Sequence, residues 1–148
     1  MHRKIIPAVV SGQTVYAVAP NDNVRTAAKI MAAQKIGAVM VMDGESLVGI
    51  LTERDMTGRV IAKNRDPDEV TVREVMTADP DTLAPNDTAV DAIKLMKERG
   101  YRHLPVKDGK KVVGMVSVRD LYAIYNLELE QDVRDRDAFI HGESYGLG

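Results

Sequence analysis

The sequence of 148 residues contains no cysteine. This absence excludes a framework of disulfide bonds and every metal or redox site that depends on thiolates. A basic excess is also lacking, because 20 Lys and Arg side chains stand against 22 Asp and Glu, for a formal net charge of −2. Nucleic-acid-binding domains usually carry a clear basic excess, so we expect no nucleic-acid partner.

Long apolar runs are missing as well. No stretch reaches the roughly 18 apolar residues that a membrane-spanning helix needs, so no membrane partner is expected. The first residues carry charge but lack the long apolar stretch and cleavage site of a secretory signal, which predicts a cytoplasmic protein. The histidines (His2, His103 and His141) are too widely separated for metal-binding spacing, so we expect no metal.

The composition that remains is that of an ordinary globular protein, with 45% hydrophobic and 28% charged residues. A chain of this size can bury about 70% of its unfolded surface, so its core needs no metal or disulfide for support.

An internal duplication organises the chain. Residues 18–56 align without a gap with residues 83–121, at a constant offset of 83 − 18 = 65. The identical pairs include Pro20/Pro85, Asn21/Asn86, Asp22/Asp87, Ala27/Ala92, Met31/Met96, Val41/Val106, Gly49/Gly114, Arg54/Arg119 and Asp55/Asp120. Two copies are too few for a solenoid, so the repeat predicts a closed pair of domains.

Each copy shows the same order of elements. A short strand over 15–18 precedes a helix that Asp22 is expected to cap, with Val24, Ala27 and Met31 on one face. Two apolar strands follow around an Asp-Gly turn, at 43–44 and again at 108–109. A second helix opens at Thr52 or Ser117.

The order per copy is therefore β-α-β-β-α. The sequence predicts an α/β (α+β) fold in which two such repeats pack as a pseudo-twofold pair. We expect an N-terminal segment over 1–14, a first domain with its linker over 15–77, and a second domain with an extended C-terminal helix and tail over 78–148.

The strongest site signal is GILTERD at 49–55, which returns as GMVSVRD at 114–120. One reading is structural, because the Thr or Ser caps a helix and the Asp three residues later completes a capping box. The other reading is functional: the helix start attracts a phosphate, the Asp accepts hydrogen bonds from ribose hydroxyls, and Arg54 or Arg119 holds a phosphate by a forked contact. The recurrence of the motif favours function, and both readings stay open.

Several features together resemble a stand-alone CBS-domain pair, also called a Bateman module. They are the duplication, the linker VREVMT at 72–77, the segment RHLPV at 102–106 and the two G-h-h-[ST]-x-x-D motifs. The resemblance covers about 14–125. It implies clefts between the domains that bind AMP, ADP, ATP, NAD, S-adenosylmethionine or a related adenosyl ligand. It also implies a regulatory or signal-transducing sensor that commonly forms a disc-shaped homodimer, and no catalytic residues.

The resemblance also implies roles for individual residues. Asp55 and Asp120 match ribose-binding carboxylates, with Thr52 and Ser117 nearby. The remaining implied nucleotide-binding residues are Arg54 and Arg119 in the motifs, Val18 and Leu83 at the first strands, and Arg102, His103 and Pro105 in RHLPV. The first copy departs from this last segment with Gly37, Ala38 and Met40, so the two sites need not be equally occupied.

Two other functions remain alternatives to an adenosine-nucleotide sensor. One is a small nucleotide-using enzyme, although no catalytic triad can be identified; the other is a structural dimerisation protein with empty clefts. A helical stripe of Tyr122, Tyr125, Leu129 and Val133 extends beyond the repeat. It predicts a surface for a second copy or a regulated protein partner, unless it only covers the chain's own core.

Overall fold

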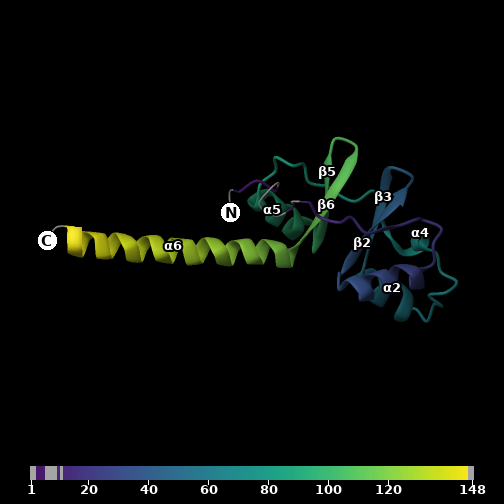
Figure 1. Ribbon diagram of the computed structural model, residues 1–148. Coiled ribbons are helices and arrows are strands. Elements are labelled where there is room, and N and C mark those ends of the chain that lie inside the picture. Colours follow the sequence, from purple (N-terminus) through teal and green to yellow (C-terminus); the bar gives the residue numbers. More distant parts are fainter. Residues whose placement is uncertain (1–2, 6–9, 11, 147–148) are drawn as a thin grey trace.

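The computed structural model describes residues 3–5, 10 and 12–146, with side chains as far as residue 138. Two α+β repeats lie side by side, and one long helix projects from them (Figure 1). The first repeat and the linker contain β1 (Ala17–Val18), α2 (Val24–Gln34), β2 (Ala38–Asp43), β3 (Ser46–Thr52), α3 (Glu53–Met56), the π-helical turn η1 (Thr57–Ile61), α4 (Val72–Val75) and β4 (Thr77–Ala78). The second contains α5 (Ala89–Arg99), β5 (His103–Asp108), β6 (Lys111–Ser117) and α6 (Val118–Gly146).

The sheets confirm the predicted mixed fold with two β-α-β-β-α repeats. In the first sheet the strand order is β1-β2-β3-β4, with β1 parallel to β2 and the other neighbours antiparallel. The second sheet pairs β5 with β6, and Leu83 bridges Val106 in the place that β1 takes in the first repeat. Gly44 and Gly109 both have φ +62°, which a tight hairpin turn requires and which glycine adopts without strain.

The first helix of each repeat begins at a side-chain cap. Asn23 caps α2 by accepting a hydrogen bond from the Thr26 N–H at 2.9 Å, so the prediction of Asp22 as N-cap is wrong. The Asp22 carboxylate instead accepts from the Ala19 N–H, which closes the turn before the helix. The first strand is also shorter than predicted, because only residues 17–18 pair with β2.

Each repeat encloses its own apolar core, and each core is completed by a segment that precedes the other repeat. The first core includes Val70, Val72 and Val75 from the linker. The second includes Ile5 and Val10 from the N-terminal segment, and the Ile5 N–H donates to the Asp87 carbonyl at 2.8 Å. The domain boundaries expected from the sequence stay a prediction.

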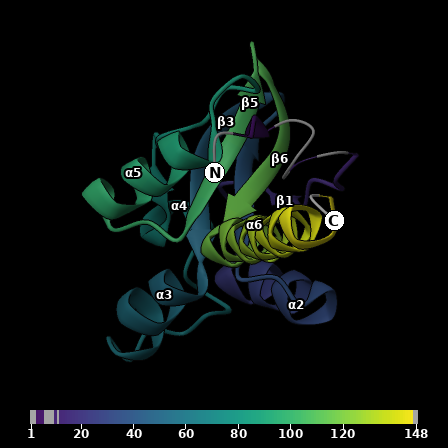
Figure 2. The ribbon, with the colours of Figure 1, turned by 90° about the vertical axis from the view of Figure 1, so that its left-hand side faces the viewer.

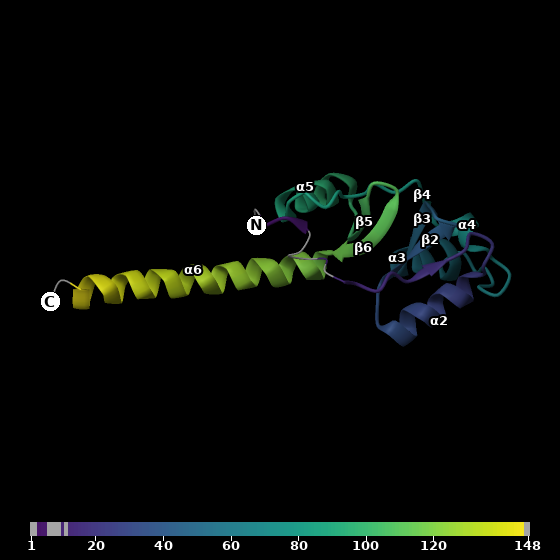
Figure 3. The ribbon, with the colours of Figure 1, turned by 45° about the horizontal axis from the view of Figure 1, so that its top comes forward.

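The helix α6 leaves the body at Val118 and extends far beyond the second repeat (Figures 1 and 3). Figure 2 shows the helix nearly end-on, in front of the body of the molecule. Leu121 and Ile124 are buried against the body, whereas the predicted stripe Tyr122, Tyr125, Leu129 and Val133 is exposed. Among the described residues, no helix combines the length and apolar character needed to cross a membrane.

Candidate functional site

The motif at 49–55 ends in a reciprocal pair of hydrogen bonds between Thr52 and Asp55. The Thr52 Oγ1 accepts from the Asp55 N–H at 3.2 Å, and the Asp55 Oδ2 accepts from the Thr52 N–H at 3.0 Å. Asp55 is only 8% exposed, and its other oxygen, Oδ1, lies 3.8 Å from Nε of Arg59. The predicted capping box is therefore confirmed, and it fixes this carboxylate at one orientation.

The second motif builds the same arrangement. The Ser117 hydroxyl accepts from the Asp120 N–H at 3.1 Å, and the Asp120 Oδ2 accepts from the Ser117 N–H at 2.8 Å. The residue matching Arg59 at the 65-residue offset is Ile124, which is buried and apolar. Asp120 therefore lacks the guanidinium that stands four residues after Asp55.

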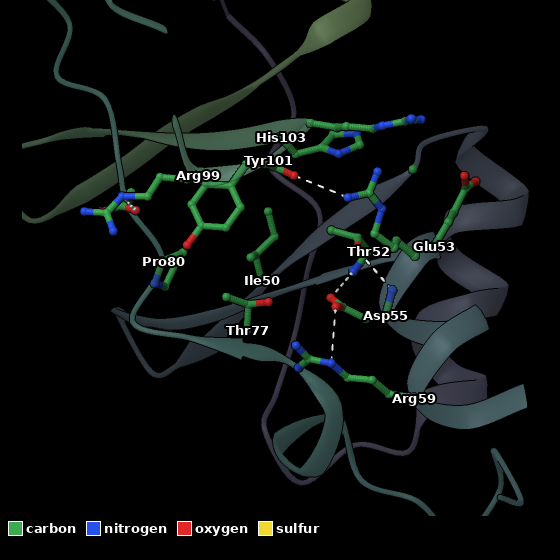
Figure 4. A pocket seen from close by; sticks show the side chains of 15 residues that line it. Ile50, Thr52, Glu53, Asp55, Arg59, Thr77, Pro80, Arg99, Tyr101 and His103 are labelled. Atoms are coloured by element: carbon green, nitrogen blue, oxygen red, sulfur yellow. Dashed lines mark hydrogen bonds and ion pairs between the residues drawn. The ribbon is translucent and has the colours of Figure 1, made fainter. Parts of the chain in front are cut away.

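A pocket of about 310 Å³ lies in front of the Thr52–Asp55 box (Figure 4). One side comes from residues 52–55 of the first repeat, and the facing side comes from residues 100–103 of the second. The Tyr101 ring lies across the pocket from Asp55, with Ile50 between them (Figure 4). We call this space pocket 1.

A larger space of about 1140 Å³, pocket 2, lies in front of the Ser117–Asp120 box. Residues 117–120 of the second repeat form one side, and residues 35–38 of the first form part of the other. These ranges are the counterparts of 52–55 and 100–103 at the offset of 65. Each pocket thus combines the helix start of one repeat with the strand start of the other, as a pseudo-twofold pair requires.

Most residues predicted for the site lie at these pockets. Thr52, Arg54 and Asp55 line pocket 1; Ser117, Arg119 and Asp120 line pocket 2; Arg102 and His103 line both. Three predicted residues do not line either pocket: Val18, Leu83 and Pro105 are buried. The Leu83 N–H donates to the Pro105 carbonyl at 2.9 Å, so this pair holds the first strand of the second repeat in place. Their part in reading a base stays a prediction.

Other lining residues were missed by the sequence analysis. Tyr101 directly precedes RHLPV, so its position beside that segment was the available signal. Arg59 follows Asp55 by four residues, the spacing that brings side chains together on a helix. Its guanidinium also donates to the Val75 and Met76 carbonyls at 3.0 and 3.1 Å, and so ties the end of the linker to the pocket.

Charged groups surround the half-buried imidazole of His103. Burial lowers the pKa of His103, the negative charges of Asp120 and Glu53 act in the opposite direction, and Arg102 lowers it further. The side chain is therefore neutral around pH 7 and can take part in hydrogen bonds as both donor and acceptor.

Around pocket 1, Arg54 donates to the Gly100 carbonyl at 3.3 Å, and Arg99 lies 3.5 Å from Asp81. These guanidinium groups give the pocket forked donors suited to phosphate or carboxylate oxygens. Within the described part of the chain, no three His, Asp or Glu side chains converge as a metal site would require.

The comparisons with known proteins agree with this geometry. The sequence model of the CBS-domain family matches residues 5–61 and 72–126 of this chain. The CBS domain-containing protein YhcV of Bacillus subtilis is 36% identical over 72% of this chain and 76% of its own length. A 17.7 kDa protein of Acidianus ambivalens is 40% identical over 72% of this chain. The matched region covers 65% of that relative's own length.

Solved structures show the same fold. A protein with CBS domains from Burkholderia ambifaria is 41% identical, with a TM-score of 0.72 over 75% of this chain and 82% of that one. A CBS domain protein of Pyrobaculum aerophilum and the CBS domain pair of protein MJ0100 share the fold at 21% and 24% identity, with TM-scores of 0.70 and 0.73. They cover 76% and 81% of this chain, and 87% and 94% of their own. The duplicated sequence, the pseudo-twofold fold and these matches show that the chain belongs to the CBS-domain family.

Proposed function

We propose that this protein is a regulatory sensor that binds an adenosine nucleotide in its pockets and catalyses no reaction of its own. The observation that carries the proposal is the repeated placement of Asp55 and Asp120 at the pocket walls. In each box Oδ2 is held by a backbone N–H, which fixes the carboxylate at the wall. An ionised carboxylate is acceptor-only, so it suits the two vicinal hydroxyls of a ribose.

The rest of pocket 1 suits the other parts of a nucleotide. Ile50 and Tyr101 supply apolar and aromatic surface for a base, and Arg54 supplies a forked donor for a phosphate. The volume of about 310 Å³ lies at the lower end of the range for small-molecule sites, about 300–1,000 Å³.

The ligands of similar folds support adenosine as the common part. The Pyrobaculum protein was solved with AMP, and the pair of protein MJ0100 with 5′-methylthioadenosine and S-adenosyl-L-methionine. These molecules share adenosine and differ beyond the ribose. AMP, ATP and NAD remain the candidate ligands for this chain.

We also propose that the protein pairs with a second copy and acts on a separate regulated protein in the cytoplasm. The exposed stripe of α6 supports a partner surface, because Tyr122, Leu129 and Val133 are 64%, 44% and 54% exposed. A purely structural dimer with empty pockets is the competing function.

The test is the rise in melting temperature caused by AMP in wild type and in the double variant Asp55→Asn/Asp120→Asn. Ligand at about 100 times its dissociation constant should stabilise the wild type by about 2.7 kcal/mol, a rise of about 5–10 °C for this chain length. The double variant should lose most of the rise, because Asn lacks the charge that strengthens a hydrogen bond by roughly 1.5–3 kcal/mol.

Asp91→Asn is the matched control. Asp91 forms the same type of box with Thr88 but lines neither pocket. This variant should lower the melting temperature without ligand and keep the AMP-induced rise. A full rise in the double variant would exclude the ribose assignment, and no rise in wild type with AMP, ATP or NAD would favour the structural dimer.

A further inference from the structure

The two pockets share a wall. Four residues line both of them: Gly37, Glu53, Arg102 and His103. The other charged groups that line pocket 1 or pocket 2 belong to one pocket only. A ligand that contacts the shared wall from one side therefore meets side chains that the other pocket also uses.

Arg102 is the shared cation, and the first repeat has no equivalent of it. At the offset of 65, its counterpart is position 102 − 65 = 37, where the chain has glycine. The space beside Gly37 is filled by His103, because a Cβ at position 37 would lie 3.2 Å from Cε1 and 3.3 Å from Nε2 of the imidazole. Pseudo-twofold symmetry would give each pocket its own side chain at this position, but at positions 37 and 102 the sequence supplies one guanidinium, which lines both pockets.

Each cation that belongs to pocket 1 alone has at least one protein partner, which orients its guanidinium and leaves other N–H groups for a ligand. Arg54 donates to a carbonyl, Arg59 faces Asp55, and Arg99 faces Asp81. The exposed guanidinium of Arg102 makes no hydrogen bond or ion pair with the side chains and backbone that the structure describes. The same holds for Lys35 and Arg119, but they line pocket 2 alone, so Arg102 is the uncommitted cation that both pockets can reach. It is free to turn toward either pocket.

We propose that Arg102 is a shared phosphate-binding residue that makes the two pockets antagonistic for phosphorylated nucleotides. This inference rests on the proposed adenosine-nucleotide function. A guanidinium fork binds one phosphate in bidentate fashion, so a phosphate held in one pocket withholds Arg102 from the other. The second nucleotide then binds without that charge-assisted contact. Adenosine has no phosphate, so its two binding events are independent of Arg102.

The test is titration calorimetry with AMP and with adenosine. The variant Asp120→Asn weakens binding in pocket 2 and so gives the dissociation constant of pocket 1 by itself. The variant Asp55→Asn gives that of pocket 2 in the same way. If the pockets were independent, the second dissociation constant of wild type would match the weaker single-pocket value within about 2-fold. We expect the second AMP to bind about 10-fold more weakly than that value, since a charge-assisted contact is lost. Adenosine should show no such discrepancy.

Arg102→Gln separates a shared residue from simple repulsion between two phosphates. The second dissociation constant of Arg102→Gln should match the weaker value from Arg102→Gln/Asp120→Asn and Arg102→Gln/Asp55→Asn, so the AMP discrepancy should disappear. Repulsion alone predicts that it persists or grows when a positive charge is removed, and that result would overturn the proposal. Arg73→Gln, which removes an exposed guanidinium that lines neither pocket, should keep the wild-type discrepancy.

The failure of this inference is distinguishable from failure of the proposed function. Two AMP molecules bound with their single-pocket affinities would reject the antagonism and leave the nucleotide-binding function intact. No binding of either AMP or adenosine would reject both.

Discussion

The imidazole of His103, from the second repeat, packs directly against the backbone of Gly37, from the first. A Cβ at position 37 would lie 3.2 Å from the imidazole Cε1 and 3.6 Å from Oε2 of Glu53. This contact brings a titratable side chain into the seam between the repeats, where burial lowers its pKa.

The lowered pKa of His103 predicts a pH-dependent stability. Between the folded pKa and the unfolded value near 6.5, the unfolded chain binds more protons than the folded chain, so stability rises with pH. The contribution is fully present above the unfolded pKa, about 6.5, and is lost as pH falls from there through the lower folded pKa. Without ligand, the melting temperature of His103→Gln should therefore fall less than that of wild type when the pH is lowered from 7.5 to 5.5.

Two carboxyl groups with lowered pKa values, Glu74 and Asp91, act outside this pH window. Hydrogen bonds from Thr71 lower the pKa of Glu74, and those from Thr88 lower the pKa of Asp91. Their stabilising effect is present above their unfolded pKa values, about 4, and is lost only below them. Identical pH slopes in wild type and His103→Gln would contradict the prediction.

Two glycines of the first repeat should respond to alanine with opposite signs. At Gly49, a Cβ would lie 3.0 Å from the Thr77 carbonyl oxygen and would collide with the Met76 side chain. Gly49→Ala should therefore lower the free energy of unfolding by about 1–3 kcal/mol. Gly58 lies in η1, and outside its own helical turn no atom lies within 4 Å of its Cβ position, so Gly58→Ala should raise that free energy by about 0.4–1 kcal/mol.

Urea unfolding of the two variants measures both changes. A neutral Gly49→Ala would show that the linker strand β4 moves away from β3 without loss of stability.

The exposed stripe of α6 predicts self-association. Tyr122, Tyr125, Leu129 and Val133 lie on one helix face, and a twofold interface would use this face from both copies. Sedimentation equilibrium at micromolar concentration should give about twice 16.3 kDa for wild type. Leu129→Asp/Val133→Asp should shift the mass toward the monomer, because it places charge in the apolar interface.

The repeats should keep their melting transition in this variant, since both side chains are exposed. A wild-type mass of a single chain would reject the interface.

Base selectivity is expected from the buried first strands. If backbone groups near Val18 and Leu83 pair with the adenine edge, guanine leaves them unpaired at a cost of about 1–3 kcal/mol. AMP should then bind at least about 5-fold more tightly than GMP in calorimetric titration. Equal affinities would show that these strands do not read the base.

The sequence by itself determined the features that depend on neighbouring residues. The gapless duplication predicted two equal repeats, and the Asp-Gly pairs predicted both hairpins. The spacing of Thr52 and Asp55, and of Ser117 and Asp120, predicted capping boxes that the hydrogen bonds confirm. Each of these signals lies within a few residues, so its physics is local.

Even locally, similar side chains can compete. Asp22 and Asn23 both carry a carbonyl-type oxygen next to the start of α2, and only the observed turn assigns Asn23 to the helix and Asp22 to the Ala19 N–H.

Only the tertiary structure decided which distant segments meet. It placed Arg102 and His103 opposite the Thr52–Asp55 box, and added Tyr101 and Arg59 to the same pocket. It also packed Ile5 into the core of the second repeat, although the first repeat follows it in sequence. These contacts depend on how two repeats of almost identical pattern are oriented against each other. Repeat identity alone leaves that orientation open, and contacts between the repeats, such as that of His103 with Gly37, accompany the observed one.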